Sequence, residues 1–426
     1  MMTISQSEAL IILQSGQNVF LTGGGGTGKS FVIRKYTEWL QRQGREVILC
    51  APTGVAAENI NGMTLHRTFH IPVKPIGPAE LILEQNEYLD YVDVVIIDEI
   101  SMVRFDVFDY VVRCIQLSEA RTQKKKQLVV MGDFYQLPPV LSNEDREVLA
   151  ECWGLSWHEI NKGYAFLNTK WEDMNFLNIK LRETVRQEAG SLYGEILNEL
   201  RTYNVRNMQW INQNSQEEEQ YMDDGQLAIT LCSTRQQAKE INDKEIEKLP
   251  GTALIYDAYI NGDVRISGDE IKDCNLENKL YIKLGMRVMA CINNPDENYQ
   301  NGSMGIVTEL NEESVEVAFD NGSVTRIYRY LHEVQEYVAE EDELHKRVVG
   351  TIWQFPIKPA YAITIHKSQG CTFEKMNLYP DCFEVGQLYV ALSRVKSIEG
   401  LYLYNPILEE YIKESTAVKM FYRSFE

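Results

Sequence analysis

The chain has 426 residues, enough for about three domains, and its 62 acidic side chains against 42 basic ones give a net charge of −20. An acidic protein repels polyanions at long range, so binding to nucleic acid would require a local basic groove. The eight cysteines form no C-x-x-C pair, the six histidines form no ligand-spaced cluster, and neither a signal peptide nor a membrane-length apolar run is present, which argues against zinc-binding, secreted and membrane proteins.

A short helix is expected to begin within residues 4–9, just before the first strand that the apolar pattern predicts. Gln6 in this helix carries an amide that could pair with the edge of an adenine ring. A surface glutamine near an N-terminus is the commoner case, so Gln6 alone identifies no site.

The segment 23–30, Gly-Gly-Gly-Gly-Thr-Gly-Lys-Ser, has the full spacing of a phosphate-binding loop. The apolar run 19–21 predicts a strand before it, and an amphipathic pattern predicts a helix after it, which is the context that such a loop requires. Its glycines let backbone N–H groups point at phosphate oxygens, and the helix N-terminus adds positive potential. We therefore expect a nucleoside triphosphate to bind with Mg²⁺. Lys29 should reach the β- and γ-phosphates, the Ser30 hydroxyl should ligate Mg²⁺, and Gly26, Thr27 and Gly28 should surround the phosphates.

Two polar segments follow the strand predicted at residues 47–51. They are Pro-Thr-Gly at 52–54 and Thr-Leu-His-Arg-Thr-Phe at 64–69. Side chains at the carboxyl ends of parallel strands line the ligand crevice of such a sheet, so Thr53 and His66 could bond phosphates there. Packing is nevertheless the commoner role for a single histidine. Three prolines then make residues 71–78 a stiff loop before a short helix near residue 79.

The run Val-Val-Ile-Ile-Asp-Glu at 94–99 is the second motif that indicates a nucleotide site. Four consecutive β-branched residues predict a strand buried on both faces, and two carboxylates follow it. In an ATP site, Asp98 would hold Mg²⁺ through water and Glu99 would polarise the attacking water.

The next predicted strand, at residues 127–131, ends in Gly-Asp-Phe-Tyr-Gln-Leu-Pro-Pro at 132–139. Gln136 in this segment could sense the γ-phosphate from beside the phosphate loop. The basic loop 121–126 before the strand is expected to be solvated rather than bound to DNA.

The order of these motifs and the residues in them resemble those of the Pif (petite integration frequency) family of superfamily-one, 5′-to-3′ DNA helicases. The resemblance rests on the phosphate loop, Ala-Pro-Thr-Gly at 51–54, Thr-Leu-His at 64–66, Asp-Glu-Ile-Ser-Met at 98–102 and Gly-Asp-x-x-Gln-Leu-Pro-Pro at 132–139. Residues 101–114 also resemble the family's own signature.

The second half of the chain continues the resemblance. A strand predicted at 176–181 leads into Arg-Glu-Thr-Val-Arg-Gln, where Arg186 is similar to the family's arginine finger and Val185 stands where the family usually has an aromatic residue. Residues 227–232 predict the first strand of a second α/β sheet. In the family, the segment matching His366 and Lys367 touches the tracked strand. The resemblance further implies that Gln369 and Gly370 lie near the γ-phosphate and that Arg394 points across the cleft at it.

These expectations define an α/β fold with two RecA-like parallel-sheet motor domains. Short alternating strands from residue 287, with a tight Asp-Asn-Gly turn at 320–322, resemble the small Src-homology-like barrel that this family inserts in its second domain. We expect a first domain at 1–180, with a small wedge insertion at about 70–90. The second domain should span 181–426, interrupted by the barrel at 287–358.

The resemblance implies an ATP- and Mg²⁺-dependent 5′-to-3′ DNA helicase that tracks on single-stranded DNA. Its partners would be single-stranded DNA and duplexes with a 5′ overhang, with guanine quadruplexes as a further candidate and no membrane. The protein would act as a monomer in the cytoplasm, on the nucleoid when bound to DNA, in DNA repair, recombination or telomere maintenance. The residues expected to touch the strand are Pro52, Thr53, Gly54, Thr64, His66, Thr364, His366 and Lys367.

Three other functions stay open from the sequence. One is an RNA-directed helicase of the same superfamily, and another is a nucleotide-dependent clamp that binds single strands without unwinding. The intact hydrolytic residues argue against the clamp. The third is a small-molecule kinase, which would need neither the segment 136–139 nor the segment 366–370 in a second sheet.

Overall fold

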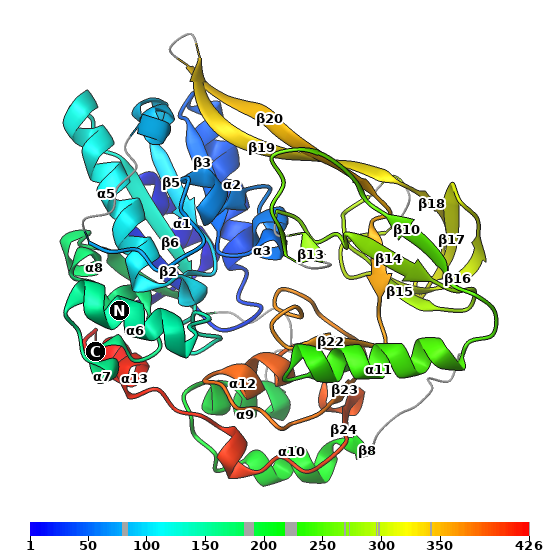
Figure 1. Cartoon of the computed structure of the whole chain (residues 1–426). Coiled ribbons are helices and arrows are strands. Elements are labelled where there is room, and N and C mark those ends of the chain that lie inside the picture. The colour runs from blue at the N-terminus through cyan, green and yellow to red at the C-terminus, as the bar shows by residue number, and fades with distance from the viewer. Residues whose placement is uncertain are drawn as a thin grey trace.

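The computed structural model describes the whole chain apart from residues 79–83, 183–190, 218–227, 268–269, 272, 295, 297–298, 341–342 and 426. The expected arginine finger Arg186 and the start of the helix expected near residue 79 lie outside the described residues. Two parallel sheets with their helices and a group of antiparallel sheets make up the rest (Figure 1).

The first parallel sheet has seven strands in the order β1-β7-β2-β6-β5-β3-β4. Its central strands β2, β5 and β6 are buried along their whole length because helices cover both faces. Side chains of β2 alternate between these faces, so that Val19 and Leu21 pack with helices α1 and α2 while Phe20 packs with helix α5. The strands are β1 (Met2–Ile4), β2 (Val19–Thr22), β3 (Val47–Ala51), β4 (Met63–Thr64), β5 (Val94–Ile97), β6 (Gln127–Gly132) and β7 (Leu177–Leu181).

Local signals set the starts of the first two helices. Ser5 and Glu8 form a capping box, in which the Ser5 hydroxyl accepts from the Glu8 N–H and the Glu8 carboxylate accepts from the Ser5 N–H. Gly28 precedes α2 with a φ of 84°, a left-handed conformation that glycine adopts at little cost. The helices around this sheet are α1 (Gln6–Gln14), α2 (Lys29–Arg42), α3 (Gly54–Asn59), α4 (Leu65–Thr68), η1 (Glu84–Tyr91), η2 (Ile100–Met102), α5 (Phe105–Thr122), α6 (Asn143–Trp153), α7 (Trp157–Ile160), η3 (Ala165–Leu167) and α8 (Thr169–Asp173).

The second parallel sheet has five strands in the order β22-β9-β23-β24-β8. Its apolar side chains pack with those of helices α9 and α12 in one core, which includes Leu231, Leu200 and Leu388. The strands are β8 (Gln216–Glu217), β9 (Ile229–Cys232), β22 (Ala362–Thr364), β23 (Met376–Leu378) and β24 (Leu401–Leu403). The helices of this part are α9 (Leu192–Arg201), α10 (Met208–Asn214), α11 (Arg235–Lys248), α12 (Gln387–Leu392), η5 (Ile398–Gly400) and η6 (Glu409–Tyr411). The last helix, α13 (Thr416–Arg423), packs on the first sheet.

The antiparallel strands lie between β9 and β22 in the chain and begin at Leu254, earlier than the residue 287 expected from the sequence. The early strands β10 and β11 pair with β14 and β20, which come much later, so their role is not visible in the local pattern. The expected turn at 320–322 is confirmed, because β17 and β18 form a hairpin around it. The strands are β10 (Leu254–Asp257), β11 (Tyr259–Gly262), β12 (Ile266–Ser267), β13 (Glu270–Ile271), β14 (Lys279–Ile282), β15 (Arg287–Ala290), β16 (Met304–Leu310), β17 (Ser314–Phe319), β18 (Val324–Tyr328), β19 (Tyr330–Glu340), β20 (Glu343–Gln354) and β21 (Ile357–Pro359).

Two long-range contacts tie later parts of the chain to the first sheet. The hairpin β19–β20 reaches across to it (Figure 1), where the Tyr337 ring stacks on the Tyr88 ring with 5.8 Å between centroids. Helix α13 also returns to it, and the Tyr422 hydroxyl lies 3.0 Å from the Thr22 hydroxyl. Both the antiparallel part and the C-terminal helix therefore pack on the first sheet.

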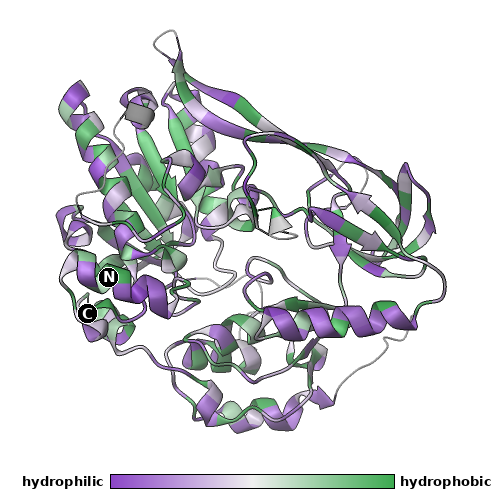
Figure 2. Ribbon diagram, viewed as in Figure 1, coloured by the Kyte–Doolittle hydropathy of each residue, from purple (hydrophilic) through white to green (hydrophobic). Residues whose placement is uncertain are grey.

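The distribution of hydropathy fits these layers. Hydrophobic residues concentrate on the inner strands of the first sheet, whereas the outer helix α11 is largely hydrophilic (Figure 2). No helix in the described part of the chain is long and apolar enough to cross a membrane. The expected fold class, α/β with two parallel sheets and an all-β part, is confirmed.

Candidate functional site

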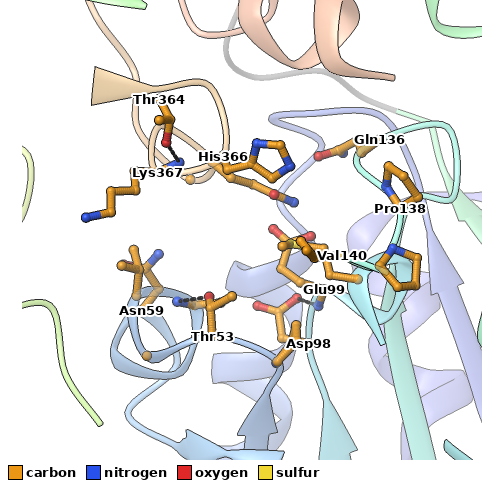
Figure 3. A pocket seen from close by; sticks show the side chains of 18 of the residues that line it. Thr53, Asn59, Asp98, Glu99, Gln136, Pro138, Val140, Thr364, His366 and Lys367 are labelled. Atoms are coloured by element: carbon orange, nitrogen blue, oxygen red, sulfur yellow. Dashed lines mark hydrogen bonds between the residues drawn. The ribbon is translucent and has the colours of Figure 1, made fainter. Parts of the chain in front are cut away.

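One cleft of about 1610 Å³ is lined by residues of both parallel sheets and of the antiparallel part. Among the described residues it gathers every site residue expected from the sequence except Gln6. Thr364, His366 and Lys367 on one side of this cleft face Thr53 and Asp98 on the other (Figure 3). Residues far apart in sequence, on the strand ends of both sheets, thus share one space.

The phosphate loop forms part of the wall of the cleft. The Thr27 hydroxyl donates to the Gly24 carbonyl at 3.1 Å and closes the loop on itself. Lys29 Nζ donates to the carbonyls of Gly23 at 2.8 Å and Gly24 at 3.1 Å. Burial lowers the pKa of Lys29, and neighbouring carboxylates partly oppose that change. A partly buried ammonium held by carbonyl oxygens is placed to exchange them for the stronger phosphate acceptors.

Gln6 supports the phosphate loop from outside the cleft. Its Nε2 donates to the Thr27 carbonyl at 3.1 Å. A Cβ atom added to Gly28 would lie 2.2 Å from Gln6 Nε2, so this close approach suits glycine. The contact of Gln6 with an adenine ring stays a prediction.

The two expected carboxylates follow strand β5, and Asp98 is buried whereas Glu99 is partly exposed in the cleft. The Glu99 N–H donates to Asp98 Oδ1 at 2.7 Å, and Glu99 has a φ of 48°, a conformation that non-glycine residues seldom adopt. Burial raises the pKa of both groups, and the Glu99 charge adds to the effect on Asp98. Two adjacent carboxyl groups whose charged forms are disfavoured fit a divalent cation, because its charge would stabilise those forms.

Arg394 belongs to the second sheet and acts electrostatically on Glu99 of the first. The residue is 2% exposed, and its Nε donates to the Val390 carbonyl at 2.8 Å while its Nη2 donates to the Ser393 hydroxyl at 2.7 Å. Although burial raises the pKa of Glu99, the charges of Lys29 and Arg394 act in the opposite direction. Arg394 therefore already interacts electrostatically with the expected hydrolytic group.

Four threonines follow or end parallel strands and cap the turn after them. In each case the hydroxyl accepts from the N–H group three residues later, which leaves its own hydrogen for a ligand. One of them, Thr234, was not expected from the sequence, although its Ser-Thr-Arg segment follows β9 as Pro-Thr-Gly follows β3. The four are Thr53 after β3, Thr64 at the end of β4, Thr234 after β9 and Thr364 at the end of β22.

The two histidines of the cleft are held neutral. Burial, helped by Arg265 and Arg104, lowers the pKa of His66 to about 4. Burial also lowers the pKa of His366, with a smaller effect from Arg235. At physiological pH both imidazoles can therefore donate a hydrogen bond without carrying a charge.

Basic residues make part of this cleft locally positive, although the whole chain has a net charge of −20. Arg235, Arg265 and Lys367 all line it. Arg265 Nη2 donates to the Thr64 hydroxyl at 3.0 Å and pairs with Asp273. Arg265 could not be predicted from the sequence, because it belongs to the antiparallel part and meets Thr64 only in the fold.

A buried polar junction beside the phosphate loop was also missed from the sequence. Arg201 on α9 makes two bonds of 2.7 Å to the Asp133 carboxylate, and both side chains are almost fully buried. The Tyr389 hydroxyl on α12 accepts from the Gly25 N–H at 3.0 Å. The second sheet's helices therefore contact the phosphate loop and the end of β6 directly.

Comparison with known proteins agrees with this geometry. Residues 3–216 match the family described as PIF1-like helicase. The chain is 32% identical over 413 residues to the ATP-dependent DNA helicase Pif1 of Campylobacter jejuni, covering 91% of this chain and 89% of the relative.

Two solved structures extend the similarity to the whole fold. Bacteroides sp Pif1 in complex with ADP-AlF4 superposes with a TM-score of 0.82 at 29% identity, covering 100% of this chain and 97% of that one. Bacteroides Pif1 bound to ssDNA superposes with a TM-score of 0.72 at 30% identity and the same coverage.

Proposed function

The chain belongs to the PIF1-like helicase family, and we propose that it is an ATP-dependent DNA helicase. One observation carries the proposal: the phosphate loop and the polar strand ends of both sheets line the same cleft. A nucleotide in that cleft would lie close to side chains that can also touch a strand, which is the arrangement that a translocating ATPase needs.

For hydrolysis, we assign the phosphates to the loop from Gly26 to Ser30 and the orientation of the attacking water to Glu99. The Ser30 hydroxyl and the Asp98 carboxylate supply the hard oxygen ligands that Mg²⁺ prefers. Bound there with ATP, Mg²⁺ would neutralise the charge that develops on the phosphates. Gln136 lines the same part of the cleft and is assigned to the γ-phosphate.

Closure of the two sheets on the nucleotide would couple hydrolysis to movement. Arg394 belongs to the second sheet, and its charge already acts on Glu99 of the first. An arginine supplied across a cleft stabilises the transition state only when the cleft is closed. We assign Arg186 the same role, on the family resemblance alone.

The strand would lie across the capped threonines and neutral histidines of both sheets. Pro52, Thr53, Gly54, Thr64 and His66 would contact it from the first sheet, and Thr364, His366 and Lys367 from the second. The position of these groups on both sides of the cleft supports a strand that is gripped alternately as the sheets close and open (Figure 3).

We further propose, from the family resemblance, 5′-to-3′ polarity and a monomeric helicase with motor domains at 1–180 and 181–426. The all-β insertion of the second domain would include the strands from Leu254 as well as the residues 287–358. Guanine quadruplexes are proposed as substrates on the same ground. A clamp without turnover is not favoured, because Glu99 lies within the electrostatic reach of both Lys29 and Arg394.

The test is strand separation on three labelled duplexes, with a 5′ overhang, a 3′ overhang or blunt ends, in the presence of Mg²⁺ and ATP. We expect unwinding of the 5′-tailed duplex alone, and none by Lys29→Ala on any duplex. ATP turnover is measured in parallel with single-stranded DNA, single-stranded RNA or no strand. If only RNA stimulated ATP turnover, RNA rather than DNA would be the substrate. If the protein bound a strand without ATP turnover, it would be a nucleotide-dependent clamp.

A further inference from the structure

The cleft contains four exposed apolar side chains to which the proposed function assigns no role. Each is strongly exposed although it lies inside a hollow of the protein. Exposed apolar groups gathered at one place mark an interaction site more often than isolated ones do. They are Val73 at 80% exposure, Val140 at 73%, Phe383 at 56% and Ile266 at 45%.

These side chains come from four separate segments of the chain. Val73 follows α4, and Val140 follows the Gln-Leu-Pro-Pro segment of the first sheet. Ile266 belongs to the antiparallel part, and Phe383 to the loop between β23 and α12. The four segments come together in the lining of the cleft. Val140 and Pro138 are among the lining residues drawn in Figure 3.

Three of the four lie next to residues of the strand-binding face. Glu384, the neighbour of Phe383, acts on the charge of His366. Arg265, the neighbour of Ile266, donates to the Thr64 hydroxyl. Lys74 is the neighbour of Val73, and its backbone carbonyl accepts a hydrogen bond from Arg104. The charge of Arg104 helps to lower the pKa of His66.

The loop that carries Phe383 is held firmly. The N–H groups of Phe383 and Glu384 both donate to the side-chain oxygen of the buried Gln387, at 3.0 and 3.2 Å. Glu384 also pairs with Lys162 of the first part of the chain at 2.8 Å. The exposed ring therefore projects from a fixed backbone, as a stacking platform must.

Resting on the proposed function, we propose that Val73, Val140, Ile266 and above all Phe383 contact the unstacked bases of the bound single strand. A single strand presents phosphates and bases in alternation, and the threonines, histidines and basic residues account only for the phosphates. Every base has an apolar face that can stack on an aromatic ring without regard to sequence. The cleft would thus hold the strand through two chemically different sets of contacts.

The experiment measures binding by fluorescence anisotropy to an oligothymidine and to the same backbone with its bases removed. We expect Phe383→Ala to bind the oligothymidine roughly 5- to 150-fold more weakly than the parent protein, the range for loss of one base–aromatic stack. On the abasic strand the two proteins should bind equally. Phe383→Trp should restore the preference for bases. The salt dependence of Phe383→Ala should keep the parent's slope, because the phosphate contacts remain.

Tyr328→Ala is the matched control, since Tyr328 is 57% exposed on strand β18 and does not line the cleft. It should bind both strands as the parent does and keep the basal ATP turnover.

Equal losses on the two strands for Phe383→Ala would overturn the proposal, because the ring would then support the phosphate contacts alone. A raised KM for ATP with unchanged strand affinity would also overturn it and place the adenine ring against Phe383. If the parent protein binds no strand, the proposed function itself fails. If the parent binds and unwinds while Phe383→Ala matches it on both strands, only the base contact is refuted.

Discussion

Replacing Arg201 by methionine tests whether the two sheets are joined at the buried junction beside the phosphate loop. Arg201 and Asp133 are 5% and 0% exposed, and two bonds of 2.7 Å connect them. Although burial would raise the pKa of Asp133, Arg201 holds it below its usual range. Removing the arginine leaves this carboxylate buried and uncompensated.

The expected loss follows from that uncompensated charge. Breaking a buried ion pair from one side costs about 3–5 kcal/mol. For a domain of roughly 150–250 residues this corresponds to a fall of roughly 6–20 °C in the unfolding midpoint. The Arg201 guanidinium also stacks on the Tyr135 ring at 4.9 Å, so the loss should lie in the upper part of the range.

The assay is a double-mutant cycle by thermal unfolding with Arg201→Met, Asp133→Asn and both together. The double variant should recover much of the loss, because neither charge then remains buried. The Tyr422 hydroxyl, which lies 3.4 Å from Asp133 Oδ1, would keep its hydrogen bonds with Thr22 and the Phe134 N–H in these variants.

Arg326→Met is the control, because Arg326 is 45% exposed and pairs with the exposed Glu309 and the partly exposed Glu316. Surface pairs of this kind contribute about 0–1 kcal/mol, so its midpoint should move little. If Arg201→Met shifted the midpoint no more than Arg326→Met, or if the two junction variants were simply additive, the reasoning about the junction would be refuted.

Four further outcomes are expected. Lys29→Ala should lose Mg-ATP turnover with an unchanged unfolding midpoint, and near-normal turnover would contradict the phosphate site. Glu99→Gln should retain bound ATP together with the strand in a filter-binding assay. Hydrolysis within a few-fold of the parent rate would mean that Glu99 has a structural rather than a hydrolytic role. Because burial holds the pKa of His66 at about 4 and its unfolded value is about 6.5, stability present above pH 6.5 should fall by about 3 kcal/mol as the pH drops to 4. His66→Asn should lack that part of the fall in pH-dependent melts. Arg394→Ala should reduce turnover by roughly 10³–10⁵ with ATP affinity kept, whereas Lys367→Ala should only raise the strand concentration needed for stimulation. Equal behaviour of these two variants would contradict their separate roles.

The sequence predicts those parts of the site that consist of consecutive residues. The phosphate loop needs eight neighbouring residues, and the acidic pair needs only the strand before it, so each chemical role follows from local order. The same holds for the threonine that caps a turn after a strand. Thr234 could have been found in this way, because its segment repeats the position of Thr53 in the other sheet.

Contacts between distant residues left no such pattern. Arg201 and Asp133 are 68 positions apart, and Tyr422 and Thr22 are 400 apart. Neither pair produces a periodicity, and a buried arginine in a helix looks like a solvated one until its partner is known. The early start of the antiparallel part was missed for the same reason, because strands β10 and β11 find their partners far along the chain.

The charges of the cleft explain how an acidic protein can hold a strand and still release it. Arg265 is balanced by Asp273, and the two histidines are neutral, so the attraction stays local and limited. Hydroxyl and imidazole donors to a phosphate each contribute roughly 1–3 kcal/mol, comparable with the roughly 1.4 kcal/mol needed to open one base-pair step. Contacts of that size can be exchanged one at a time as the sheets move. A row of unpaired lysines would bind the strand more tightly and would resist each step.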